Sequence, residues 1–243
     1  MRATLSLIAL LLFPVLCLGQ STDPLFAAAV KAHGGDAVFT VTALTIRGQS
    51  SQGGGKPQPV VISASLLDNR IRLDYGQPIY RTDVSKPEGG FSEVNGVTTW
   101  RAAHAGAYAQ LDWFSILGAR HLAVSVEQAV LADSSISGRA TSVAKVATGR
   151  QQIQYRRQIK DEAEVQFDKE TGLVAAISRR QTADQSLDLT FILTTTFSDY
   201  RPVAGMALPY QIRRFVDGRL VETIAVDSIE INPAFERYFF GRY

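Results

Sequence analysis

Alternation of apolar and polar residues runs through this 243-residue sequence and constrains its fold more than any other feature. The longest alternating run has apolar residues of one parity at Leu187, Leu189, Phe191, Leu193 and Phe197. Because successive side chains of a strand point to opposite faces, this pattern predicts an antiparallel sheet with one apolar face and one solvated face. The apolar face must be covered by helices, by a second sheet, or by curling of the sheet on itself.

The same pattern recurs between turn residues and predicts roughly nine or ten strands. Examples of such strands are 44–47, 60–66, 71–75 and 173–177. Asn95-Gly96 predicts a type I′ hairpin turn, and Asp217-Gly218 marks a second turn between two alternating segments. Beyond Asp227 the alternation slips by one residue, as a β-bulge allows. We interpret residues 50–59, which are rich in Ser, Gly and Pro, as an exposed loop.

Two segments depart from the alternation and predict helices. The first covers residues 25–33, starts at Asp23-Pro24 and ends at Gly34-Gly35. From residue 105 to 132, apolar residues recur at helical spacing, which predicts one or two helices broken near Gly118. We interpret 133–139 as a polar connector. No repeat or domain boundary is visible, so residues 20–243 are expected to form a single domain.

The N-terminus has the pattern of a secretory signal peptide. Arg2 precedes an apolar run that ends near Cys17, and Cys17 and Gly19 form a small-x-small cleavage pattern, so we expect cleavage after residue 19. A membrane anchor is the alternative, but the run is shorter than the roughly 20 residues a spanning helix needs. Lipoprotein modification of Cys17 is disfavoured by the bulky Leu16. The mature chain then has no cysteine and is expected to be periplasmic or secreted, which excludes a disulfide scaffold and a thiol enzyme.

No catalytic or metal-binding pattern stands out. The formal net charge of +2 is too balanced for a protein that binds nucleic-acid phosphates. His33, His104 and His121 are isolated from one another and from carboxylates at ligand spacing, so neither a zinc site nor any cofactor is predicted. Paired arginines occur at 156–157, 179–180 and 213–214, and we expect them to pair across strands with acidic residues such as Glu222. The alternative is a basic rim for acidic head groups.

Three stretches of the sequence resemble one known family. The first stretch is 200–210 together with Arg213-Arg214, the Asp217-Gly218 turn and residues 226–233. The second is the hairpin 167–174, and the third is residues 33–48. These stretches resemble periplasmic proteins similar to the outer-membrane lipoprotein-sorting carriers, the LolA-like proteins. The resemblance implies an unclosed, strongly curved antiparallel β-barrel with helices in its mouth, a cavity for acyl chains, and no cofactor or covalent chemistry. Arg47 lies near the strand where those carriers use an arginine to steady a closed lid, but no flanking motif assigns it that role.

Alternation and resemblance together predict a mainly β (α+β) fold. A single curved antiparallel sheet would form an incomplete barrel, with the N-terminal helix and the central helical segment covering its concave apolar face. We expect a monomeric binder or carrier of lipid or lipidated protein that takes up an acyl chain, with an envelope protein as a second potential partner. The residues expected to line the cavity are Leu44, Ile46, Ile62, Leu73, Tyr75, Trp113, Phe114, Leu117, Leu189, Phe191, Leu193 and Phe197.

Two other functional hypotheses remain open at this point. In a structural or interaction protein of the cell envelope, the same apolar residues would form a filled core, and Trp113 and Phe114 would be ordinary core residues. An exported hydrolase is less favoured because no nucleophile–base pair or metal cluster is visible.

Overall fold

The computed structural model describes residues 24–241 except 88, 102–109, 124–127, 137, 155–156 and 184–185. Side chains are also left undescribed at 101, 110–111, 121–123, 128–133, 147–154, 157–162, 181–183 and 186–189. The predicted signal peptide, residues 1–19, lies outside the described residues. Among the helices that the structure describes, none is long and apolar enough to cross a membrane.

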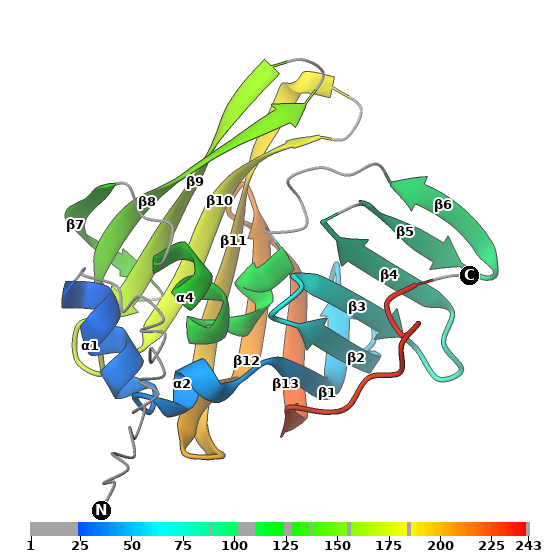
Figure 1. Ribbon diagram of the computed structural model, residues 1–243, viewed down its shortest axis with the longest axis horizontal. Coiled ribbons are helices and arrows are strands. Elements are labelled where there is room, and N and C mark those ends of the chain that lie inside the picture. The colour runs from blue at the N-terminus through cyan, green and yellow to red at the C-terminus, as the bar shows by residue number, and fades with distance from the viewer. Residues whose placement is uncertain are drawn as a thin grey trace, which may run out of the picture.

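One antiparallel sheet of 13 strands forms the body of the molecule (Figure 1). The first six strands are β1 (Ala43–Gln52), β2 (Gln58–Ser65), β3 (Arg70–Tyr75), β4 (Arg81–Lys86), β5 (Gly89–Val94) and β6 (Val97–Arg101). The other seven are β7 (Gln128–Ile136), β8 (Arg139–Gln154), β9 (Arg157–Asp168), β10 (Val174–Ala183), β11 (Ser186–Val203), β12 (Met206–Val216) and β13 (Arg219–Ile231).

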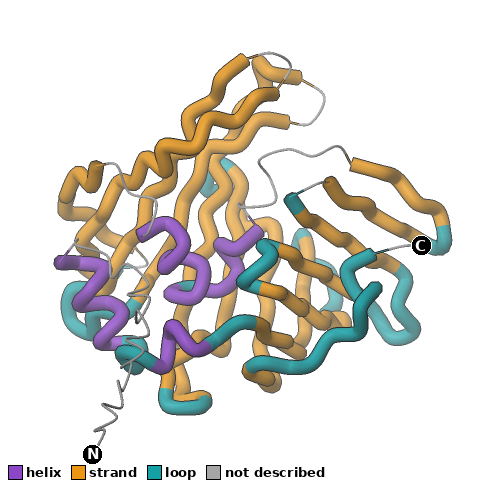
Figure 2. Tube along the Cα trace, viewed as in Figure 1, coloured by secondary structure: helices purple, strands orange, loops and turns teal. Residues whose placement is uncertain are grey.

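The strand order shows that the sheet consists of two meanders joined along one line. Strands β1 to β6 follow one another outward, strands β13 to β7 do the same on the other side, and β1 pairs with β13 between them. Strands β6 and β7 stand at the two ends of this order, so the described sheet is curved but not closed (Figure 2). This confirms the predicted mainly β fold with a single open antiparallel sheet.

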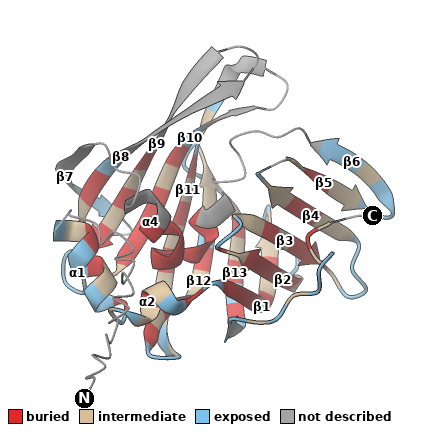
Figure 3. Ribbon diagram, in the orientation of Figure 1, coloured by how far each residue is buried: buried red, intermediate tan, exposed pale blue. Residues whose placement is uncertain are grey.

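The described residues form four short helices beside the sheet: α1 (Pro24–Ala32), α2 (Ala37–Thr40), the 3₁₀ helix η1 (Gln110–Phe114) and α4 (Ile116–Ala123). They gather on one face of the sheet, in front of it in Figure 1. Phe26 of α1 packs edge-on against Phe167 of β9, with ring centroids 5.2 Å apart. The buried residues shared by helices and sheet form one continuous core (Figure 3). The predicted covering of the apolar face by an N-terminal and a central helical segment is therefore confirmed.

Turn chemistry accounts for several boundaries that the sequence predicted. Asn95 and Gly96 both have positive φ values, 49° and 83°, as a type I′ hairpin between β5 and β6 requires. The predicted bulge near Asp227 is also present, because Arg47 pairs with Ser228 while the next residue, Gly48, pairs with Val226. The bulge leaves Asp227 as the extra residue and changes which side chains of β13 face the core.

Other predictions about the elements were wrong. The sheet has 13 strands rather than nine or ten because the polar segment Arg81–Lys86 is a strand and residues 128–136, expected to be partly helix and partly connector, form β7. Apolar runs such as this one fit both periodicities. The predicted loop 50–59 shrinks to 53–57, since both ends extend the strands. The helix break falls at Ser115, which has a positive φ of 51°, and Gly118 lies inside α4.

The C-terminal segment covers a different part of the sheet. Phe240 is buried against Val84 of β4 and Phe91 of β5, and Phe235 and Phe239 stack beside it. Arg72 of β3 donates to the carbonyl of Phe239 at 3.1 Å and lies over its ring. Register pairs Arg72 with Val84 and Val84 with Phe91, so these side chains share a face opposite to that of Leu73. The red C-terminal segment in Figure 1 therefore protects the outer face of β3 to β5.

Candidate functional site

The residues predicted to line a cavity lie together on the face of the sheet that the helices cover. Nine of them belong to one continuous cluster of buried side chains: Leu44, Ile46, Ile62, Leu73, Tyr75, Trp113, Phe114, Leu117 and Phe197. The first five come from β1 to β3, Phe197 comes from β11, and the other three come from η1 and α4. Alternation alone thus placed these strand residues on one face, and helical spacing placed Trp113, Phe114 and Leu117 opposite them.

The remaining three predicted residues lie further along β11. Leu193 is buried, whereas Phe191 is only half-buried. The side chain of Leu189 lies outside the described residues. Phe191 has the parity of Leu193 and therefore points to the same face, two residues nearer the start of the strand.

The segment formed by η1 and α4, here called the helical segment, is attached to the sheet by a buried ion pair. Arg179 Nε of β10 lies 3.0 Å from Asp112 Oδ1 of η1, and each side chain is only 4% exposed. Arg179 has the parity of Ile177, so its strand position directs it into the apolar face. A buried guanidinium must be paired, and Asp112 supplies the partner.

A second buried arginine attaches the helical segment to the chain that enters β1. Arg120 of α4 donates to the backbone carbonyls of Val38 and Val41, the latter at 2.6 Å. Burial lowers the pKa of this guanidinium to about 10, so it remains charged at neutral pH. These bonds satisfy carbonyls at the end of α2, where the helix leaves backbone acceptors without partners.

Further polar contacts surround Trp113 of η1. The guanidinium carbon of Arg214 of β12 lies 3.9 Å from the Trp113 ring centroid, a cation–π arrangement. Arg214 Nη1 also lies 3.7 Å from the carboxylate of Glu222 on β13, which confirms the predicted pairing across strands. Ser50 and Gln52 of β1 donate to the same carboxylate, at 2.7 and 3.2 Å. Burial lowers the pKa of Arg214, and the charge of Glu222 counteracts this effect.

We refer to Asp112, Trp113, Arg179, Arg214 and Glu222 as the arginine cluster. Sequence reasoning predicted the Arg214–Glu222 pair but missed the Asp112–Arg179 pair and the contact of Arg214 with Trp113, because these join residues far apart in the chain. One signal was available: Arg179 and Arg214 occupy the apolar parity of their strands, in phase with Ile177 and Ile212. A charged residue in that phase predicts a buried charge with a partner.

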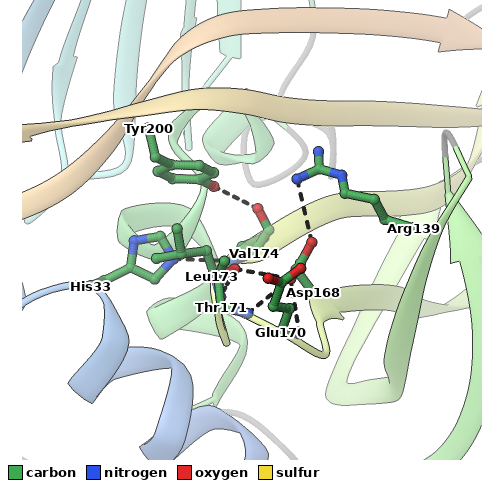
Figure 4. Close-up of polar contacts among 8 residues, drawn as sticks. All are labelled: His33, Arg139, Asp168, Glu170, Thr171, Leu173, Val174 and Tyr200. Atoms are coloured by element: carbon green, nitrogen blue, oxygen red, sulfur yellow. Dashed lines mark hydrogen bonds and ion pairs between the residues drawn. The ribbon is translucent and has the colours of Figure 1, made fainter.

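A second polar cluster lies where α1 meets the sheet (Figure 4). We call it the His33 cluster, and it consists of His33, Tyr200 and Asp168 with the groups that they contact. The His33 ring is buried, and both of its nitrogens are used: Nδ1 bonds the Ala207 carbonyl at 2.8 Å, and Nε2 accepts the Val174 N–H at 3.1 Å. These partners assign the proton to Nδ1 and the lone pair to Nε2. Burial lowers the pKa of His33 to about 4, against a smaller opposing effect of the Ala207 bond.

Tyr200 connects the His33 cluster to the helical segment. Its hydroxyl donates to the Val174 carbonyl at 2.5 Å and contacts the Ser115 hydroxyl at 2.7 Å. The Tyr200 ring also packs edge-on against His33, with centroids 5.3 Å apart. Burial raises the pKa of Tyr200, so the hydroxyl stays protonated and can donate.

Asp168 completes this cluster at the hairpin between β9 and β10. Its carboxylate accepts the backbone N–H groups of Glu170 and Thr171 at 3.0 and 2.9 Å, and Arg139 lies 3.3 Å away. Burial opposes ionisation of Asp168, but these hydrogen bonds and Arg139 outweigh it and lower the carboxyl pKa. The carboxylate therefore fixes a turn and is fully occupied in doing so.

The histidine and acidic side chains of the described site make structural contacts. In the part of the chain that the structure describes, no group of three or more His, Cys, Asp or Glu side chains could hold a metal ion. His33 is committed to two backbone groups, which makes it a satisfied structural histidine.

Comparison with known proteins gives likeness to solved structures only. No family model matches the sequence, and no curated protein matches it. A LolA superfamily protein from Nitrosomonas europaea matches with a TM-score of 0.48 and 7% identity, over 89% of this chain and 96% of that chain. A DUF1329 family protein from Desulfovibrio piger gives a TM-score of 0.48 and 11% identity, over 89% and 95%. The lipoprotein LppX from Mycobacterium tuberculosis gives 0.30 and 10%, over 65% and 88%.

The described architecture is an open, curved antiparallel sheet with an N-terminal helix and a short central helix on one face. These are the features of fold that the resemblance seen in the sequence implied.

Proposed function

We propose that this protein is a non-enzymatic, periplasmic binder or carrier of lipid or lipidated protein, acting as a monomer after signal-peptide cleavage near Gly19. An acyl chain would lie between the helical segment and the apolar face of the sheet. The sequence resemblance to lipoprotein-sorting carriers supports this reading, and so does the open curved sheet with helices on one face that the resemblance implied.

One observation carries the proposal: the cover of the apolar face is short, broken and fastened by polar contacts. The helical segment consists of two short helices that meet at Ser115. Its attachments include the Asp112–Arg179 pair, the Arg120 bonds to backbone carbonyls, and the Ser115–Tyr200 contact. When the segment moves away, its polar groups can form hydrogen bonds to water in place of those to the sheet. A cover held by apolar packing alone gains no such replacement contacts from water.

Displacement of the helical segment would expose two apolar surfaces that face each other. Trp113, Phe114 and Leu117 line its underside, and Phe197 and Ile62 are among the sheet residues opposite. Each methylene group of an acyl chain that enters gains about 0.8 kcal/mol from leaving water. Uptake of a long chain can therefore offset the loss of the contacts between the helical segment and the sheet.

The alternative function is a structural or interaction protein of the cell envelope whose apolar face is a filled core. The observation that favours it is the burial of the predicted lining residues against one another in a single cluster. Both functions predict these residues buried in the ligand-free protein. They differ in whether the cluster opens to admit a ligand.

Two measurements test the proposal. Mass spectrometry of protein purified natively from an exporting host should find co-purified lipid, and the purified protein should take up a fluorescent fatty acid. A matched pair of variants on β11 locates the site: Phe191→Asp places a charge on the half-buried apolar side, and Thr190→Lys places one on the exposed side. Uptake should be lost in the first variant and kept in the second. Absence of lipid together with absence of uptake, or equal uptake by a folded Phe191→Asp protein, contradicts the proposal.

A further inference from the structure

Two buried donors in the arginine cluster lack hydrogen-bond partners. Among the described residues, neither Trp113 Nε1 nor Arg214 Nε has an acceptor, although both atoms are buried. The two side chains stack on each other, the guanidinium carbon 3.9 Å from the ring centroid. A buried N–H without an acceptor destabilises the folded protein, and such groups are rare in native structures. Two of them in contact, one on the helical segment and one on the sheet, call for a functional explanation.

The acidic groups nearby are already engaged by other donors. The Glu222 carboxylate accepts hydrogen bonds from Ser50 and Gln52 and lies 3.7 Å from Arg214 Nη1. Asp112 is paired with Arg179. A guanidinium has five N–H donors and no acceptor, so Arg214 retains capacity for a further oxygen. Trp113 Nε1 and Arg214 Nε are therefore the two donors of the arginine cluster that a further oxygen could satisfy.

The position of the two donors limits what kind of acceptor can reach them. Arg214 stands opposite Thr195 and Glu222 in the sheet, which makes a row of polar side chains across β11 to β13. The next row on the same face is Phe197, Ile212 and Ile224, all fully buried in the apolar core. A ligand spanning both rows must be apolar along its length and must carry an oxygen at one end.

We propose that Arg214 and Trp113 bind the oxygen-bearing end of the acyl chain, its carboxylate or ester carbonyl, while the chain itself extends along the apolar row toward Phe197. This inference rests on the proposed function and specifies the ligand: an acyl group with an accessible oxygen acceptor, oriented with that oxygen at the arginine cluster. Arg214 Nε and Trp113 Nε1 each donate to the ligand oxygen. Because one donor sits on the helical segment and the other on the sheet, the ligand oxygen also links the two.

The test compares ligands of equal chain length by displacement of the neutral fluorescent probe N-phenyl-1-naphthylamine. Oleate offers a carboxylate, methyl oleate offers only an ester, and 1-octadecene offers no oxygen. The wild-type protein should bind oleate or methyl oleate about tenfold more tightly than 1-octadecene, the difference expected for a hydrogen bond to a charged donor. Comparison of the affinities for oleate and for methyl oleate then distinguishes a carboxylate ligand from an ester ligand.

Three variants assign the preference to residues. Arg214→Gln and Trp113→Phe should each reduce the preference for oxygen-bearing ligands while 1-octadecene binding stays near wild type. Arg213→Gln alters the exposed neighbour and should keep the preference. Should Arg214→Gln fail to fold, as judged by circular dichroism and urea unfolding, Trp113→Phe still removes one donor with an aromatic ring retained.

Two results overturn the inference, and they have different meanings. Equal affinity of the wild type for all three ligands, or a full preference in folded Arg214→Gln and Trp113→Phe proteins, means that an apolar ligand site exists but that these donors do not select an oxygen. Absence of binding of any of the three ligands contradicts the proposed function as well.

Discussion

The His33 cluster and the arginine cluster are both buried, and both join helices to the same face of the sheet, yet they differ in how completely their hydrogen bonds are satisfied. In the His33 cluster, both ring nitrogens of His33, both carboxylate oxygens of Asp168 and the Tyr200 hydroxyl all have partners. In the arginine cluster, Trp113 Nε1 and Arg214 Nε have none among the described residues.

The two clusters also differ in the kind of group that their side chains contact. The His33 cluster binds mainly backbone groups, the Ala207 and Val174 carbonyls and the Val174, Glu170 and Thr171 N–H groups, so it fixes the path of the chain. The arginine cluster joins charged side chains to one another: Asp112–Arg179 links the helical segment to the sheet, and Arg214–Glu222 links two strands. The first arrangement suits a permanent anchor for α1. The second suits a contact that separates and re-forms.

Loss of one partner of the buried ion pair should have the largest effect on stability. Asp112→Ala leaves the Arg179 guanidinium buried without its counter-ion, and we expect a loss of about 3–5 kcal/mol in the free energy of unfolding. The double variant Asp112→Leu with Arg179→Met removes both charges and should recover most of that loss. Urea unfolding of the wild type, Asp112→Ala and the double variant measures it, and a loss below about 1 kcal/mol for Asp112→Ala would show that the pair is not buried as described.

The His33 cluster should make stability depend on pH in a defined window. The pKa of His33 falls from 6.5 to about 4 on folding, so the folded state disfavours its protonation. The contribution of neutral His33 to the free energy of unfolding is fully present above pH 6.5. It is lost as pH falls toward 4, and the loss is about 3 kcal/mol at most. His33→Gln should remove this dependence, because glutamine does not titrate. Urea unfolding at pH values from 7 to 4 gives the free energy of unfolding of the two proteins as a function of pH. Parallel curves for the wild type and His33→Gln would refute the assignment of the pH dependence to His33.

A pair of adjacent glycines tests how tightly α1 is anchored beside His33. Gly34 has a φ of +119°, and an added Cβ would lie 2.4 Å from the Gly205 carbonyl oxygen. Gly34→Ala should therefore lower the free energy of unfolding by about 2–3 kcal/mol. Gly35→Ala is the matched control: φ is +63° with nothing within 4 Å of its Cβ, so about 1 kcal/mol is expected. Equal losses in the two variants would mean that the chain relaxes around Gly205.

Loss of the Tyr200 hydroxyl, which connects the His33 cluster to the helical segment, should have the smallest effect on stability. Tyr200→Phe removes the hydroxyl that bonds the Val174 carbonyl and contacts Ser115, at an expected loss of about 1 kcal/mol. Tyr210→Phe, on the next strand and only half-buried, serves as a control and should change stability by a few tenths of a kcal/mol. Thermal unfolding can resolve this difference, and identical stabilities would show that the Tyr200 hydroxyl contributes nothing.

Local features of the fold could be predicted from the sequence because local chemistry determines them. The Asn95-Gly96 turn and the bulge at Asp227 depend on neighbouring residues alone, and alternation placed Leu44, Ile62 and Phe197 on one face. Strand β4 could not be predicted from its polar sequence. It is held by pairing with β3 and β5, and buried Asp83 accepts a bond from Ser92 at 2.5 Å.

The candidate site was only half predictable, for a related reason. Its apolar residues follow from parity and helical spacing, which a single segment reveals. Its polar residues depend on register between distant strands: Ser50 meets Glu222, and Arg179 meets Asp112, only after the sheet and the helical segment are in place. The parity of Arg179 and Arg214 indicates from the sequence that both charges face the apolar side of the sheet, where Arg179 is buried and Arg214 half-buried, but does not show which partners they find.

The pairing of β1 with β13 has a consequence for how the protein folds. Every other pair of neighbours in the described sheet joins strands consecutive in the chain, whereas this pair brings Leu44 opposite Ile231. Hairpins close short loops and form quickly, but joining these two strands closes nearly the whole chain into one loop, at a higher cost in chain entropy. We therefore expect each meander to acquire structure independently, and the rate of folding to be set by the late encounter of β1 with β13.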